Sequence, residues 1–119
     1  MERSEELRAI DCPVAVAQNI LAGKWKLVVV WRLKDGVMRF GELQRSIPGI
    51  KQSSLTQQLR ELEQDGVIHR EVYTQIPPKV EYSLTNIGRQ LIGVLYSFGA
   101  WGAEYKKECL NSGSDTAGI

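Results

Sequence analysis

The sequence predicts a mainly α-helical fold with one small β-hairpin, an α+β arrangement within a single domain. Apolar residues recur at helical spacing in most segments of the 119-residue chain. Segments 67–73 and 80–84 carry the β-branched and aromatic residues typical of strands, and a connector with two prolines separates them. The length fits one compact domain, and 43% hydrophobic residues suffice for a small core.

Two helices are predicted in the first third of the chain. Segment 13–21 begins with Pro13, which suits a first helical turn. Its apolar residues follow a helical period, at Val14, Ala17 and Leu21. Segment 24–33 is strongly apolar, and its β-branched run alone is compatible with a strand. Its length and the stop signal Asp35-Gly36 favour a helix that is buried on most sides.

The middle of the chain continues with a short strand at 37–38, a short helix at 39–47 and a turn at 48–49. Segment 51–65 is the clearest helix, because one apolar stripe runs along it and a polar face lies opposite. The stripe consists of Leu55, Leu59 and Leu62. Gly66 is expected to end this helix.

The last elements are the hairpin and a long helix. We expect Val72 to pair with the Val80–Tyr82 region, and the connector 74–79 to form a stiff hairpin tip. Thr85 is a suitable N-cap for a final helix over 86–109. The predicted organisation is a flexible N-terminal arm at 1–11, a folded domain at 12–109 and a disordered tail at 110–119, whose composition is that of a linker.

The residue types that catalysis or metal binding requires are scarce. The chain has two cysteines without a Cys-x-x-Cys motif, one histidine (His69) and no Gly-rich phosphate loop. We therefore expect no enzyme activity, no metal and no cofactor. The polar, acidic N-terminus does not resemble a secretory signal, and no apolar run approaches the length of a membrane span. These features predict a cytoplasmic protein without membrane contact.

The charge distribution favours a nucleic-acid partner for the central segment. Residues 20–80 carry ten Lys or Arg and six Asp or Glu, a net charge of +4, whereas the whole chain has a net charge of +1. A basic centre is expected where a protein meets phosphate, although four charges are a mild excess.

The polar face of segment 51–65 has the groups that read DNA bases. Gln pairs with adenine, Arg pairs with guanine, and Ser and Thr contact either base. The candidate DNA contacts on this segment are Lys51, Gln52, Ser53, Ser54, Thr56, Gln57 and Arg60. An ordinary solvated surface helix is the alternative interpretation. The order of a polar-faced helix after a turn, followed by a stiff hairpin, nevertheless predicts a winged helix-turn-helix.

Other basic residues are candidates for contacts with the DNA backbone, which position a protein without reading sequence. Lys79 and Arg70 belong to the predicted hairpin, or wing. Lys24 and Lys26 lie at the start of the second helix, and Arg39 begins the third.

Several motifs then carry a family resemblance over residues 12–102. The chain resembles the HxlR-type winged-helix regulators, relatives of the MarR group. The motifs are Cys12-Pro13, Gly23-Lys24-Trp25, Arg39-Phe40-Gly41-Glu42-Leu43, Ile47-Pro48-Gly49-Ile50, the run from Leu55 to Glu63, Asp65-Gly66-Val67-Ile68, the run from Pro77 to Thr85, Gly88 and Trp101-Gly102. Each motif alone is weak, and their order and spacing together make a specific match.

The resemblance implies a dimer in which N- and C-terminal helices form a two-fold interface, while recognition helices and wings enter DNA. Members repress or activate nearby genes. The expected interface residues are Leu7, Val14, Leu95, Phe98 and Trp101. Position 51 departs from the family, which commonly has a small hydroxyl residue there. Lys51 cannot cap a helix in that way, so either Ser53 or Ser54 caps a later start, or Lys51 contacts phosphate.

The resemblance also implies a redox- or electrophile-sensing role for Cys12. A helix N-terminus favours the reactive thiolate and neighbouring Asp11 disfavours it, so an inert thiol is the alternative. Cys109 is expected to be a bystander. The tryptophans are more simply explained by packing than by stacking on a small-molecule effector, but an effector pocket between helices stays open as an interpretation.

The function predicted from these observations is a homodimeric, sequence-specific transcription regulator, such as a repressor, that binds double-stranded DNA at a pseudo-palindromic operator. Its further partner is an oxidant or small-molecule effector. The alternative is a winged-helix module for protein–protein interaction without specific DNA binding, because fold alone does not decide function.

Overall fold

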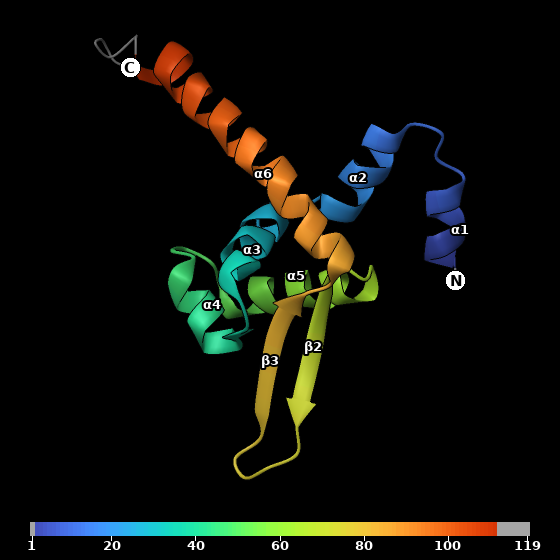
Figure 1. Ribbon diagram of the computed structural model, residues 1–119, viewed down its shortest axis with the longest axis vertical. Coiled ribbons are helices and arrows are strands. Elements are labelled where there is room, and N and C mark those ends of the chain that lie inside the picture. The colour runs from blue at the N-terminus through green and yellow to red at the C-terminus, as the bar shows by residue number, and fades with distance from the viewer. Residues whose placement is uncertain (1, 112–119) are drawn as a thin grey trace.

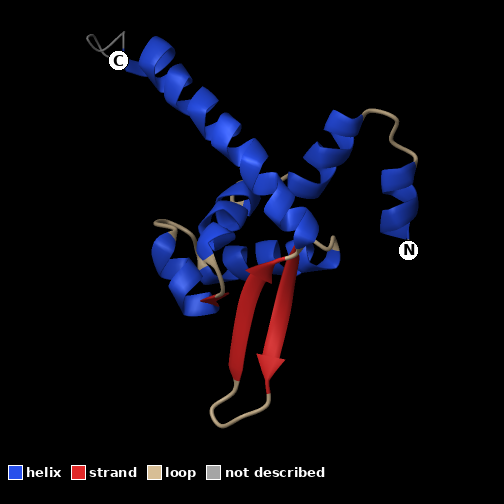
Figure 2. Cartoon of the chain, viewed as in Figure 1, coloured by secondary structure: helices blue, strands red, loops and turns tan. Residues whose placement is uncertain are grey.

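The computed structural model describes residues 2–111 and confirms the predicted order of elements from residue 13 onward (Figures 1 and 2). The helices are α1 (Glu2–Arg8), α2 (Pro13–Leu21), α3 (Lys26–Arg32), α4 (Phe40–Ser46), α5 (Gln52–Gln64) and α6 (Asn86–Tyr105). The strands are β1 (Met38–Arg39), β2 (Ile68–Tyr73) and β3 (Lys79–Leu84). A 3₁₀ turn (Leu33–Asp35) follows α3, and a π-helical turn (Lys106–Asn111) extends α6. The predicted tail at 110–119 lies outside the described residues except for its first two positions, which end this π-helical turn.

The three strands form one antiparallel sheet in the order β1-β3-β2. Val72 pairs with Val80, as expected, and the ladder extends from Ile68 opposite Leu84 to Tyr73 opposite Lys79. Strand β1 adds Met38 opposite Tyr82. Figure 1 shows the β2–β3 hairpin and α6 projecting from opposite sides of the helical body.

The apolar stripe of α5 is the centre of the core. Leu55, Leu59 and Leu62 are buried, and they belong to one cluster with residues from α3, α4, the sheet and α6. Because the inner face of α5 is held this way, its polar face points outward. Leu95 of α6 belongs to the same cluster and is only 6% exposed. Leu95 therefore contributes to the core of its own chain, which leaves little of its side chain for the predicted dimer interface.

Both ends of α5 have defined geometry. The helix begins at Gln52 with Lys51 in the N-cap position, and no described side chain caps it. The later start at Ser53 or Ser54 is thus wrong. At the other end, Gly66 has φ +79° and Val67 N donates to Leu62 O at 2.9 Å, a hydrogen bond of the Schellman type.

The N-terminal region departs from the expected flexible arm. Helix α1 forms there, and its Arg3 guanidinium donates to both carboxylate oxygens of Asp65, at 2.8 and 3.1 Å. The same guanidinium donates to the backbone oxygen of Asn19 at 3.2 Å, so α1 is connected to both α2 and the end of α5. Within residues 2–111, no helix combines the length and apolar character needed to cross a bilayer.

Candidate nucleic-acid interface

The outer face of α5 presents the predicted base-reading residues. Exposed side chains are those of Lys51, Gln52, Ser53, Gln57 and Arg60, while Ser54 and Thr56 are half-buried. The Thr56 hydroxyl donates to the backbone oxygen of Gln52 at 2.9 Å, one helical turn earlier. Helices α4 and α5 and the turn between them form the helix-turn-helix.

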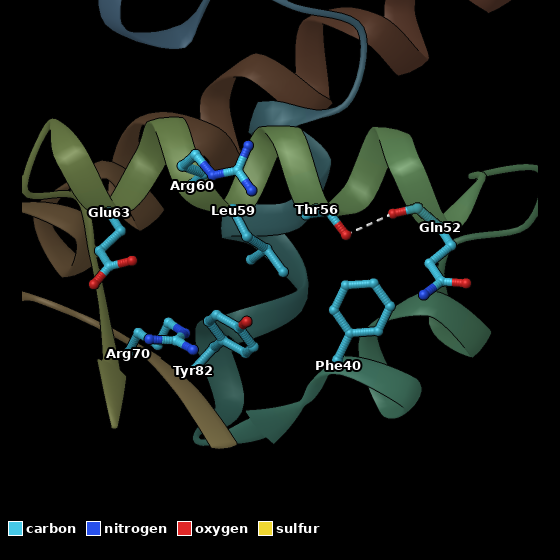
Figure 3. A pocket seen from close by; sticks show the side chains of 8 residues that line it. All are labelled: Phe40, Gln52, Thr56, Leu59, Arg60, Glu63, Arg70 and Tyr82. Atoms are coloured by element: carbon cyan, nitrogen blue, oxygen red, sulfur yellow. Dashed lines mark hydrogen bonds between the residues drawn. The ribbon is translucent and has the colours of Figure 1, made fainter. Parts of the chain in front are cut away.

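A surface hollow of about 440 Å³ separates α5 from α4 and the hairpin. Figure 3 shows α5 as one wall, with Phe40 of α4 and Arg70 and Tyr82 of the sheet opposite. Gln52, Thr56, Leu59, Arg60 and Glu63 complete the lining from α5. The hollow thus places a recognition helix, a wing strand and two arginines around one open space.

Three cations at this face are free to bind anions. Among the described residues, Lys51, Arg60 and Arg70 have no ion-pair partner. Arg39 is also exposed, and its backbone amide donates to the Glu42 carboxylate at 2.8 Å, which fixes the start of α4. A DNA phosphate would not have to break an existing ion pair at these positions.

Two other predicted backbone contacts already have partners. Lys79 is half-buried, with its ammonium 3.7 Å from Glu81 and 4.4 Å from the ring centroid of Tyr73. Lys24 is exposed and its ammonium lies 4.9 Å from the Trp25 ring centroid, ahead of α3 rather than on it.

The assignment of Lys26 to a phosphate contact was wrong. Lys26 is 4% exposed, and its ammonium lies 2.7 Å from Glu61 on α5 and 3.5 Å from the backbone oxygen of Ile20. The Asp65 side chain, at the end of α5, is likewise only 6% exposed and is bound by Arg3. Buried charges persist where they are paired, and these pairs join three helices.

A further contact on α5 was not predicted. The Gln57 amide nitrogen donates to Glu61, which also accepts from Lys26. These bonds, that of Lys26 first, lower the pKa of the Glu61 carboxyl. The i, i+4 spacing of the glutamine and the glutamate was a usable signal for the Gln57 contact, whereas nothing local indicated the lysine.

The cysteines and the expected interface residues lie away from this face. Cys12 is exposed at the N-cap position of α2, and Cys109 is exposed in the π-helical turn after α6. Val14, Phe98 and Trp101 are more than half exposed, and Leu7 is half-buried. Apolar side chains continue along α6, at Ile87, Val94, Tyr96 and Tyr105.

Comparison with known proteins agrees with this geometry. A family model described as HxlR-like helix-turn-helix matches residues 20–109. The HTH-type transcriptional regulator YdeP of Bacillus subtilis is 55% identical over 95 residues, which cover 80% of this chain and 74% of YdeP. The solved structure of the HTH-type regulator ytcD has a TM-score of 0.77 at 49% identity, with 82% of this chain and 99% of that chain covered.

A second solved structure, the redox regulator HypR in its reduced form, has a TM-score of 0.77 at 48% identity and covers 85% of this chain and 99% of its own. The family model spans most of the chain, and the outward polar helix beside a wing is the geometry of this class of DNA-binding proteins. The chain therefore belongs to the HxlR-like helix-turn-helix family and is a DNA-binding transcriptional regulator of the winged-helix type.

Proposed function

We propose that the protein is a homodimeric, sequence-specific regulator that inserts α5 into the major groove of a pseudo-palindromic operator. The observation that carries this proposal is the outward face of α5, where Gln52, Ser53, Gln57 and Arg60 are exposed on a helix anchored by three buried leucines. A recognition helix must be rigid on one side and offer donors and acceptors on the other.

The hollow beside α5 is the proposed path of one DNA strand. Arg60 lies on its helix wall and Arg70 on its wing wall, so a backbone phosphate between them receives charge from both sides. Such contacts fix the register of α5 in the groove and release counterions from the DNA.

The second copy is proposed to cover α6 and α2. Phe98 and Trp101 are 56% and 66% exposed on α6, and Val14 is 75% exposed on α2. Exposed apolar side chains in such a row mark an interaction surface. A two-fold dimer through this surface presents two α5 helices, which bind half-sites about one DNA turn apart, roughly 34 Å.

The DNA proposal is tested by fluorescence anisotropy with DNA flanking the protein's own gene, and with fragments selected from the genome. Saturable binding that resists bulk competitor DNA and weakens at higher salt is expected. Charge reversal of Arg60 should abolish it, while reversal of Lys106, at the far end of α6, should not. If no selected fragment stays bound in the presence of bulk competitor DNA, sequence-specific DNA binding is refuted and the protein-interaction alternative is favoured.

The dimer proposal is tested by light scattering coupled to size exclusion. The parent protein is expected at twice the chain mass, and Phe98→Glu with Trp101→Glu should shift it to the monomer, because two charges would be buried at the interface. A monomeric parent at micromolar concentration would contradict the proposal.

We further propose that oxidation of Cys12 regulates DNA binding. Cys12 is exposed and directly precedes Pro13 at the start of α2, and the similar protein HypR is a redox regulator. In the proposed reaction, hydrogen peroxide transfers one oxygen atom to the Cys12 thiolate, giving a sulfenate and water. After protonation to the sulfenic acid, a second thiol attacks the sulfur and displaces water, giving a disulfide.

The redox proposal is tested by the same anisotropy assay with and without peroxide. Mild oxidation should change operator affinity in the parent and in Cys109→Ser, and thiol reductant should reverse the change. Cys12→Ser is expected to be insensitive. A Cys12→Ser variant that responds like the parent would exclude Cys12 as the sensor.

A further inference from the structure

Glu61 connects the buried interior to the DNA-reading face of α5. One of its carboxylate oxygens lies 2.7 Å from the Lys26 ammonium, and the other accepts the hydrogen bond from the Gln57 amide nitrogen. The Lys26 side chain is 5% exposed and that of Glu61 is 35% exposed, while Gln57 is exposed. A single chain of contacts therefore runs from α3 to a residue on the candidate base-reading surface.

This arrangement removes the ambiguity of the Gln57 amide. A glutamine amide in solvent can present either its oxygen or its nitrogen in a given direction. An ionised carboxylate only accepts hydrogen bonds, so the amide nitrogen must face Glu61. Lys26 keeps Glu61 ionised and fixed in place, and the flipped amide would set two oxygens against each other.

The fixed amide has one defined outer edge. One N–H of the Gln57 amide is used by Glu61. In the arrangement proposed below it is the N–H trans to the amide oxygen, so the oxygen and the other N–H remain side by side. An acceptor beside a donor is the pair that glutamine uses for the N6 amino group and N7 of adenine. Guanine presents two acceptors at the same positions and does not match this edge.

We propose that Glu61, held by Lys26, is a positioning residue that presets Gln57 to read adenine in the major groove. Glu61 does not itself contact the base in this arrangement, because Lys26 and Gln57 engage both of its oxygens. The ammonium also balances the carboxylate charge, which would otherwise repel the DNA backbone. This inference rests on the proposed function and adds the base preference of one position in each half-site.

The test uses the full-length protein and its selected operator, with each base pair of the half-site substituted in turn. In the parent, one adenine should be preferred over guanine by about tenfold. Gln57→Ala should abolish this preference. Glu61→Ala should reduce the preference for adenine over guanine to within about twofold at that position, because the Gln57 amide can then rotate to either orientation. Preferences at the other positions should stay unchanged.

A combined variant guards against simple unfolding. Glu61→Ala leaves the buried Lys26 ammonium unpaired, so Lys26→Met with Glu61→Gln is tested in parallel and its folding is checked by thermal melting. A glutamine at 61 donates as well as accepts, so it no longer dictates the Gln57 orientation, and the adenine preference should again be lost. Glu61→Ala should have no added effect on preference in the Gln57→Ala background.

The outcomes separate this inference from the proposed function. Specific operator binding with an unchanged adenine preference in both Glu61 variants would overturn the inference alone, as would an equal loss at every base position. Absence of any specific operator would overturn the proposed function and the inference together.

Discussion

Gly88 of α6 touches the backbone of Val67, and this contact sets the base of α6 against the end of α5. A Cβ built on Gly88 would lie 2.2 Å from the Val67 carbonyl oxygen. The same oxygen accepts from the Thr85 amide at 3.1 Å and from the Thr85 hydroxyl at 2.9 Å, while Thr85 caps α6 by accepting from Gly88 N at 3.2 Å. The long helix α6 therefore contacts the helix-turn-helix at Gly88, where there is no room for a side chain.

Gly88→Ala should destabilise the protein strongly. The added methyl group meets a backbone oxygen that cannot move without breaking the cap, so a loss of about 1–3 kcal/mol or more is expected. Gly93→Ala is the matched control, because nothing lies within 4 Å of a Cβ there and α6 gains helix propensity. Thermal unfolding measures both, and equal melting temperatures would contradict the close approach.

Gly66→Ala should destabilise through the backbone alone. Gly66 has φ +79° and no atom within 4 Å of a built Cβ, so crowding is excluded and the left-handed conformation is the only cost. A loss of about 1 kcal/mol is expected, and Gly66→Asn should lose less because Asn tolerates this conformation. Urea unfolding distinguishes them; an Asn variant less stable than the Ala variant would refute the explanation.

The Glu61 contacts should make the stability of the folded protein depend on pH. Lys26 and then Gln57 lower the pKa of Glu61 in the folded protein, so its contribution is present above the unfolded pKa and is lost as pH falls through the folded pKa. The parent should therefore melt higher than Glu61→Gln at neutral pH, and this difference should shrink as the pH falls below the ordinary carboxyl pKa. Arg3 of α1 also favours the ionised form, so the comparison is repeated in an Arg3→Ala background. A difference that is constant with pH would contradict the assignment.

Arg70→Ala should weaken DNA binding without altering sequence preference. Arg70 lines the hollow opposite α5 and has no ion-pair partner among the described residues, so its expected role is a phosphate contact. Affinity should fall to a similar extent for all operator variants, and the slope of log affinity against log salt should decrease in magnitude by about 1. Lys106→Ala, which removes the same charge at the far end of α6, should leave the slope unchanged. A change of preference at one base pair would instead indicate direct base contact.

Local sequence patterns predicted the order of elements from residue 13 onward, the inner and outer faces of α5 and the pairing of Val72 with the Val80–Tyr82 region, and the structure confirms each of them. Each of these features depends on residues that are close in the chain. The helical period, the alternation along strands and the left-handed conformation of Gly66 are all local properties of the backbone. The exposed base-reading candidates on α5 followed from the same periodicity.

Tertiary packing, by contrast, determines which charged residues are free and which form ion pairs inside the protein. Lys26 and Lys24 are near neighbours in sequence, yet one is buried against Glu61 and the other is exposed beside Trp25. The ion pair of Arg3 with Asp65 holds α1 against the end of α5, where a flexible arm was expected. The packing of α6 places Leu95 in the core. These outcomes depend on contacts between segments far apart in the chain, whose geometry is fixed only when the helices pack, and no local period encodes them.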